Sequence, residues 1–183
     1  MLAHENLRVV HVSTHVSLRE ACDRVKKQRV LDVIRIADKA CKDLGIKEPK
    51  IGVAGLNPHS GEHGLFGREE IDELEPAVKM AQKKSINAVG PCPADSVFHI
   101  GKSGKFDAIL SMYHDQGHIA CKTLDFQKSV TITWGLPFIR GSVDHGTAFD
   151  IAGKGIADCV SLIESTKVCV EYAVHKHEGN AMK

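Results

Sequence analysis

Short apolar runs alternate along this chain with longer segments of helical periodicity, and this alternation restricts the folds open to it. Each run is nearly continuous in apolar, often β-branched residues, which is typical of strands that are covered on both faces. Strands of this kind alternating with helices predict an α/β fold, with helices on both faces of the sheet. The predicted strands are residues 7–14, 50–56, 86–91, 106–113 and 129–135.

Three segments have the pattern of helices. Residues 17–45 are predicted to form one helix or two, because apolar residues recur at helical spacing and Gly45 stands where a helix would end. Residues 68–84 begin with acidic and end with basic side chains, as the helix dipole favours, and residues 158–177 form a closing helix. Residues 92–105 have the composition of a loop. No repeat, low-complexity tract or linker marks an internal domain boundary.

Composition argues against several functional classes. The chain has a net charge of +1 over 183 residues, with both signs interspersed. This charge pattern does not indicate binding to nucleic acid or to a membrane surface. No segment approaches the roughly 18 apolar residues of a membrane helix. The six cysteines lie far apart without a C-x-x-C pair, and residues 1–15 lack a basic end followed by an apolar run. We therefore expect reduced thiols in a cytoplasmic protein.

Three histidines stand just past the ends of predicted strands. These are His15, His59 and His114, and the C-terminal edge of an open α/β sheet is where ligands bind. Three neutral imidazoles meeting there would form a divalent-metal site with positions left open for substrate. The alternative is three unrelated surface or hydrogen-bonded histidines, since no H-E-x-x-H or C-x-x-C motif is present. Spacing alone leaves both interpretations open.

The other histidines carry weaker signals. The role of His63 is not assigned. The following histidines are expected to be surface or core residues: His4, His11, His99, His118, His175 and His177.

Two cations and one acid accompany the three histidines. Lys122 lies eight residues past His114, and Arg140 closes an apolar turn. Either could bind a phosphate or carboxylate, or could be an ordinary solvated cation. Asp95 could neighbour a metal or simply cap a helix. The glycine-bearing residues 141–158 do not form a G-x-G-x-x-G fingerprint, so composition identifies them only as a turn-rich loop.

Five long motifs resemble those of the 4-hydroxythreonine-4-phosphate dehydrogenase family, in order and over nearly the whole chain. They are "STHVSLREA", "GLNPHSGEHGLFGREEID", "GPCPADSVF", "MYHDQGHIACK" and "TITWGLPFIRGSVDHGTAFDIAGKG". The stretch "DHGTAFDIAGKGIAD" also resembles the adenine-side cofactor loop of isocitrate and isopropylmalate dehydrogenases. The resemblance implies a three-layer α/β/α fold like theirs, of which residues 1–183 are the C-terminal half.

The resemblance further implies a dehydrogenase that uses a divalent metal (Zn, Co or Mg) and NAD or NADP. Its substrate would be a small phosphorylated 3-hydroxy acid, oxidised to a β-keto acid that decarboxylates. The family works as a homodimer with the active site at the interface. Its metal ligands correspond to His15, His59 and His114. A hydrolase or lyase using the same histidines is disfavoured, because it would have no use for the cofactor loop.

Further site residues are assigned by the same resemblance. Substrate contacts correspond to Lys122, Thr131 and Arg140, and catalytic roles to Asp95 and Lys122. The cofactor loop corresponds to His145, Gly146, Thr147, Ala148 and Asp150.

Two departures from the family pattern matter. Thr131 stands where the pyridoxine-pathway enzymes commonly have an asparagine, and a hydroxyl is shorter than an amide and differs in its donors. This exchange favours the branch that acts on 4-phosphothreonate or 4-phosphoerythronate. Family members also carry a segment about as long again before the position of Met1, a length that fits a further domain. The alternative function is therefore a non-catalytic fragment that binds a metal or a phosphorylated ligand.

Overall fold

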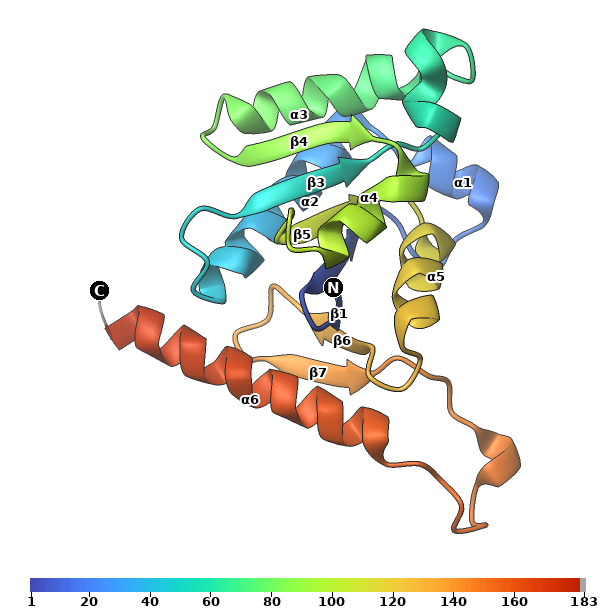
Figure 1. Cartoon of the computed structure of the whole chain (residues 1–183), viewed down its shortest axis with the longest axis vertical. Coiled ribbons are helices and arrows are strands. Elements are labelled where there is room, and N and C mark those ends of the chain that lie inside the picture. Colours follow the sequence, from blue (N-terminus) through green and yellow to red (C-terminus); the bar gives the residue numbers. More distant parts are fainter. Residues whose placement is uncertain (182–183) are drawn as a thin grey trace.

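A single mixed sheet of seven strands organises the computed structural model, which describes the backbone of residues 1–181 and the side chains of residues 1–175 (Figure 1). The strand order is β4-β3-β5-β2-β1-β6-β7. The strands are β1 (Leu2–His4), β2 (Leu7–His11), β3 (Lys50–Ala54), β4 (Asn87–Cys92), β5 (Ala108–Ser111), β6 (Val130–Thr133) and β7 (Arg140–Val143).

The sheet has a parallel part and an antiparallel part. β2, β5, β3 and β4 run parallel, so their C-terminal ends share one edge. β1 pairs antiparallel with both β2 and β6, and β6 forms an antiparallel pair with β7. Leu2 therefore lies opposite Val9 on one side and Thr131 on the other. The short β1 joins the two parts of the sheet.

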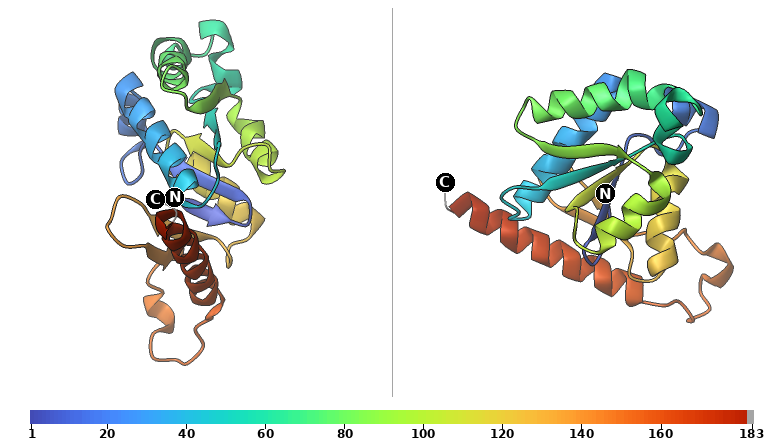
Figure 2. Two further views of the ribbon diagram at one scale, coloured as in Figure 1. Left: turned by 90° about the vertical axis from the view of Figure 1, so that its left-hand side faces the viewer. Right: turned by 45° about the horizontal axis from the view of Figure 1, so that its top comes forward.

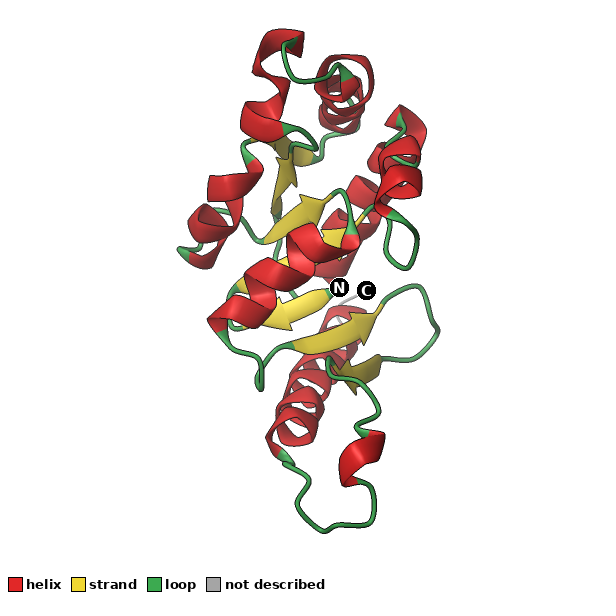
Figure 3. Ribbon diagram, turned by 90° about the vertical axis from the view of Figure 1, so that its right-hand side faces the viewer, coloured by secondary structure: helices red, strands yellow, loops and turns green. Residues whose placement is uncertain are grey.

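Helices cover both faces of the sheet, as the sequence predicts (Figure 2). α2 and α3 enclose one apolar cluster and α4 and α5 enclose another on the opposite face, while α6 packs against β6 and β7. The helices are α1 (Leu18–Asp23), α2 (Lys27–Asp43), α3 (Glu75–Gln82), α4 (Ala94–Lys102), α5 (His114–Leu124) and α6 (Val160–Ala181), with shorter turns η1 (Pro58–Gly64), η2 (Glu70–Leu74) and η3 (Phe149–Ile151). Figure 3 shows the strands between helical layers.

The predicted helix over residues 17–45 forms as two helices, α1 and α2. Ser17 caps the first by accepting a hydrogen bond from the Glu20 amide at 3.2 Å. Gly45 follows the end of α2 with φ +85°, a conformation that glycine adopts without steric cost. The predicted helix over residues 68–84 is realised as η2 followed by α3.

The loop predicted at residues 92–105 is wrong, because α4 occupies most of it. Glycine, serine and proline at its ends suggested a loop, but Ala94, Val97 and Phe98 recur at helical spacing and pack on the sheet. Val97 is fully buried. α5, β1 and β7 were not predicted either, the two strands being only three and four residues long.

Within the described residues, none of the helices combines the length and apolarity needed to cross a bilayer. All six cysteines are free thiols.

Candidate active site

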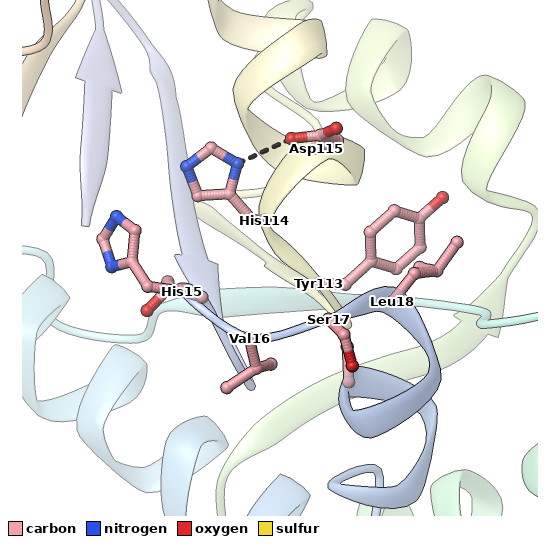
Figure 4. Close-up of a pocket in the computed structure, with 9 residues that line it drawn as sticks. His15, Val16, Ser17, Leu18, Tyr113, His114 and Asp115 are labelled. Carbon is pink, nitrogen blue, oxygen red and sulfur yellow. Dashed lines mark hydrogen bonds and ion pairs between the residues drawn. The ribbon is translucent and has the colours of Figure 1, made fainter. Parts of the chain in front are cut away.

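His15 and His114 meet at the edge where the parallel strands end. His15 lies in the loop after β2, and His114 begins α5 directly after β5, the neighbour of β2 in the sheet. Their ring centroids are 5.4 Å apart. Asp115 Oδ1 lies 2.7 Å from Nδ1 of His114 (Figure 4). With the Nδ1 proton bonded to that carboxylate, Nε2 of His114 keeps its lone pair for a cation.

This histidine pair borders two cavities. The first has a volume of about 560 Å³ and is walled mainly by the loop before α1 and by Tyr113 (Figure 4). The second, which we call the polar cavity, has a volume of about 350 Å³. Besides the histidine pair, its lining includes His11, His118, Lys122, Thr131, Asp144, His145 and Gly146. The structure thus brings two predicted metal ligands, two predicted substrate contacts and the first two residues of the predicted cofactor loop to one place.

Asp144 lines the polar cavity and contacts two of the predicted site residues, although it was not predicted from the sequence. Lys122 on α5 donates to the Asp144 carbonyl oxygen at 2.8 Å, and its Nζ lies 3.5 Å from Asp144 Oδ2. Thr131 on β6 donates from Oγ1 to Asp144 Oδ1 at 3.2 Å. The one signal in the sequence was its position, immediately before the predicted cofactor loop that begins at His145.

Two further imidazoles extend the histidine pair toward the sheet. The rings of His114 and His118 stack 3.7 Å apart on α5, and His118 lies 4.7 Å from His11 on β2. Gly117 permits this approach, because a Cβ there would collide with His11 and Val9. His11 and His118 were predicted to lie outside the site, although a spacing of four residues puts His118 beside His114 on a helix.

Burial keeps both of these imidazoles neutral. Burial, and after it the neighbouring His118, lower the pKa of His11 to about 3. Burial also lowers the pKa of His118, partly offset by its hydrogen bond to the backbone of His114. Neither ring therefore carries a positive charge at neutral pH.

His59 does not join the other two predicted metal ligands. It is exposed and lines a separate cavity of about 450 Å³ with His63, Glu62, Glu75 and others. Across the residues that the structure describes, no group of three or more His, Cys, Asp or Glu side chains is placed to hold a metal ion. One chain therefore assembles two of the three predicted ligands.

The backbone around His59 explains its placement. Residues 59–63 all have positive φ, between +43° and +81°, and form a left-handed turn within η1. Such a turn costs roughly 1–2 kcal/mol per non-glycine residue. The buried carboxylate of Glu70 anchors the segment just before it, accepting from the Leu56 amide at 2.8 Å and the Asn57 amide at 2.7 Å. Glu70 thus fixes where the turn begins.

The remaining predicted site residues lie outside the polar cavity. Arg140 is exposed on β7 and donates to Thr133 Oγ1 at 3.0 Å, and Asp95 is exposed in the first turn of α4. The later part of the cofactor loop, Thr147, Ala148 and Asp150, is exposed in a segment that extends away from the sheet (Figure 1).

Comparison with known proteins places this chain in a family. The model of the family described as "Pyridoxal phosphate biosynthetic protein PdxA" matches residues 1–169. A relative from Halalkalibacterium halodurans, named "Putative D-threonate 4-phosphate dehydrogenase", is 57% identical over 175 residues, which are 96% of this chain and 52% of the relative. A relative of the same name from Fusobacterium nucleatum is 56% identical over 94% of this chain and 52% of its own length.

Solved structures agree with this assignment. A 4-hydroxythreonine-4-phosphate dehydrogenase from Klebsiella pneumoniae superposes with a TM-score of 0.87 at 47% identity, over 93% of this chain and 52% of that one. A terephthalate 1,2-cis-dihydrodiol dehydrogenase from Burkholderia xenovorans gives a TM-score of 0.75 at 35% identity, over 93% of this chain and 54% of that one. The chain spans about half the length of the curated relatives it matches. With the family model covering most of its residues, the chain belongs to the PdxA family.

Proposed function

We propose that this chain is the C-terminal, metal- and cofactor-binding half of an NAD(P)-dependent dehydrogenase. The enzyme oxidises the C3 hydroxyl of a 4-phosphorylated 3-hydroxy acid, with 4-phosphothreonate or 4-phosphoerythronate favoured over 4-hydroxythreonine 4-phosphate. The observation that carries the proposal is the paired imidazoles of His15 and His114 beside a cavity lined by Lys122 and Thr131. The names of the relatives support the choice of a phosphorylated acid.

His15 and His114 fit a divalent cation as two of its ligands. Both are imidazoles, their rings lie 5.4 Å apart, and Asp115 orients the second ring. The cation, of which Zn, Co and Mg are candidates, would supply Lewis acidity for oxidation of the substrate hydroxyl. Because His59 of the same chain lines another cavity, we propose that His59 of a second copy completes the site in a homodimer.

Lys122 and Thr131 bind the substrate in this proposal. The Lys122 ammonium offers a compact positive charge for a phosphate or carboxylate, and the Thr131 hydroxyl offers a short donor and acceptor. Arg140, exposed at the end of the same sheet, supplies a second cation with a fork of donors. Holding both ends of the acid fixes the distance of its C3 carbon from the nicotinamide. The β-keto acid product then loses CO2.

The loop of His145, Gly146, Thr147, Ala148 and Asp150 binds the cofactor. His145 and Gly146 also line the polar cavity, so the loop begins beside the substrate and continues outward. We retain the catalytic role proposed for Asp95. Its exposure on α4 is consistent with action on a surface that the other half of the enzyme would cover. The free thiols fit a cytoplasmic location.

The second candidate is a fragment without catalysis that binds a metal or a phosphorylated ligand. One observation favours it: one copy assembles two of the three predicted metal ligands. It differs from the first candidate in predicting binding without turnover.

The test is reduction of NAD and NADP, followed at 340 nm, with each of the three acids and with or without added metal. We expect turnover that a chelator abolishes. His114→Ala should then lose activity, whereas His99→Ala, an exposed histidine outside the three cavities, should keep it. Undiminished turnover in His114→Ala would refute the metal site. Metal binding by the wild-type chain without turnover would establish the second candidate.

A further inference from the structure

Asp144 connects three parts of the site: helix α5, strand β6 and the start of the proposed cofactor loop. It follows β7 directly, and its side chain is only 10% exposed. Lys122 comes to it from α5, Thr131 from β6, and Nε2 of His118 lies 3.7 Å from its Oδ1. The next residue in the chain, His145, starts the proposed cofactor loop.

The contacts divide between the two carboxylate oxygens. Oδ1 accepts the hydrogen bond from Thr131. Oδ2 is buried with no hydrogen-bond partner among the described residues, and it faces the Lys122 ammonium at 3.5 Å. A buried carboxylate is costly unless a positive charge compensates it, so the Lys122 charge and the Asp144 carboxylate hold each other in place.

Lys122 is held by the main chain as well. Its hydrogen bond to the Asp144 carbonyl at 2.8 Å is independent of the Asp144 side chain. Removing the carboxylate should therefore loosen the ammonium without releasing it from the cavity, whereas Thr131 would lose the acceptor of its hydroxyl.

We propose that Asp144 is a positioning residue for the substrate: it fixes Lys122 and Thr131 toward the polar cavity and ties both to the start of the cofactor loop. The inference rests on the proposed function, because it assumes that these two side chains bind the phosphorylated acid. In this inference, Asp144 acts through Lys122 and Thr131 rather than on the reacting atoms.

Two substitutions separate the charge of Asp144 from its hydrogen bond. Asp144→Asn keeps an acceptor for Thr131 and the side-chain shape but removes the charge that faces Lys122. Asp144→Ala removes both. We expect KM for the acid to rise roughly tenfold in the first and more in the second, with kcat changing less than KM. A merely structural residue would instead lower the active fraction, and so kcat, with KM unchanged.

The experiment compares both variants with wild type by steady-state kinetics and by calorimetric titration with 4-phosphothreonate, 4-phosphoerythronate and 4-hydroxythreonine 4-phosphate. Asp43→Asn is the matched control, since Asp43 pairs with Lys39 on α2 away from the polar cavity. Far-UV circular dichroism shows whether each variant folds. If Asp144→Ala fails to fold, Asp144→Asn alone decides the question.

Weaker binding and a raised KM in Asp144→Asn, with Asp43→Asn like wild type, would support the inference. Wild-type affinity and KM in Asp144→Asn, or a lower kcat at unchanged KM, would overturn it while leaving the proposed function intact. A wild-type chain that binds none of the three acids would overturn the proposed function, and this inference with it.

Discussion

The parallel and antiparallel parts of the sheet are built in different ways. The parallel strands carry fully buried residues on both faces, such as Val9, Ile51 and Leu110, between two helical layers. At the antiparallel end, the buried cluster is small and centres on Ile132 and Tyr172. Large apolar side chains nearby are exposed, among them Phe138 and Phe149. The parallel part thus has a core of its own, whereas the antiparallel end depends on β1 and α6.

The candidate site lies across the boundary between these two parts. His15 and His114 belong to the parallel part, and Thr131 and Asp144 to the antiparallel end. The strongly packed part holds His15, His114 and Lys122, and the less buried part holds Thr131, Asp144 and the proposed cofactor loop. Functional loops carried by a rigid core are common in α/β folds.

The largest effect that tests this comparison is expected at Leu110, at the centre of the parallel part. Leu110→Ala leaves a cavity in a close-packed core and should lower the free energy of unfolding by about 3–5 kcal/mol. Urea denaturation followed by circular dichroism measures it. A loss below about 1 kcal/mol would show that the parallel core is not the main source of stability.

The next largest difference between the two parts is expected in the reactivity of their cysteine thiols. Burial raises the pKa of both Cys41 and Cys121 to about 12, so few thiolates form there at pH 8, whereas Cys159 is exposed before α6. Iodoacetamide should modify Cys159 roughly a hundredfold or more faster than the two buried thiols, as measured by mass spectrometry. Comparable rates at all three sites would mean that the core opens as readily as the antiparallel end.

Ile132→Ala is the counterpart of Leu110→Ala at the antiparallel end. Ile132 is equally buried, but its cluster is small and close to solvent, so the cavity can relax or fill with water. We expect a loss of about 2 kcal/mol in the same urea experiment. A loss equal to that of Leu110→Ala would remove the energetic distinction between the two parts.

The smallest effect is expected on the outer face of α6. Val170 is 58% exposed, and Val170→Ser should change the free energy of unfolding by less than about 0.5 kcal/mol. Repeating the urea denaturation at several protein concentrations makes this prediction more specific. A larger, concentration-dependent loss would reveal that a second copy covers this face.

Sequence predicted the parallel part better than the antiparallel part, for a physical reason. Strands buried on both faces must be apolar throughout, so β2, β3 and β5 are visible as runs. β1 and β7 have only three and four residues and little apolar signal, and α4 was obscured by the glycines and prolines at its ends.

Site residues that directly follow a strand could be predicted from the sequence. Site residues that come together only through tertiary packing could not. His15 and His114 follow adjacent strands and do meet. Asp144 reaches Lys122 and Thr131 only because β7 pairs with β6, a register that the sequence does not display. The same strand-end rule placed His59 at that edge, but it could not foresee a left-handed turn, which carries His59 to another cavity.

That left-handed turn has a consequence for comparing related sequences. A conformation with positive φ at five consecutive positions, 59–63, disfavours β-branched side chains whether or not a residue touches a ligand. Glycine at Gly61 is further required because a Cβ there would meet the Glu70 carboxylate. Residue preferences across this segment will therefore be narrow for reasons of backbone geometry, and invariance at Ser60 or Glu62 alone would be poor evidence of a catalytic role.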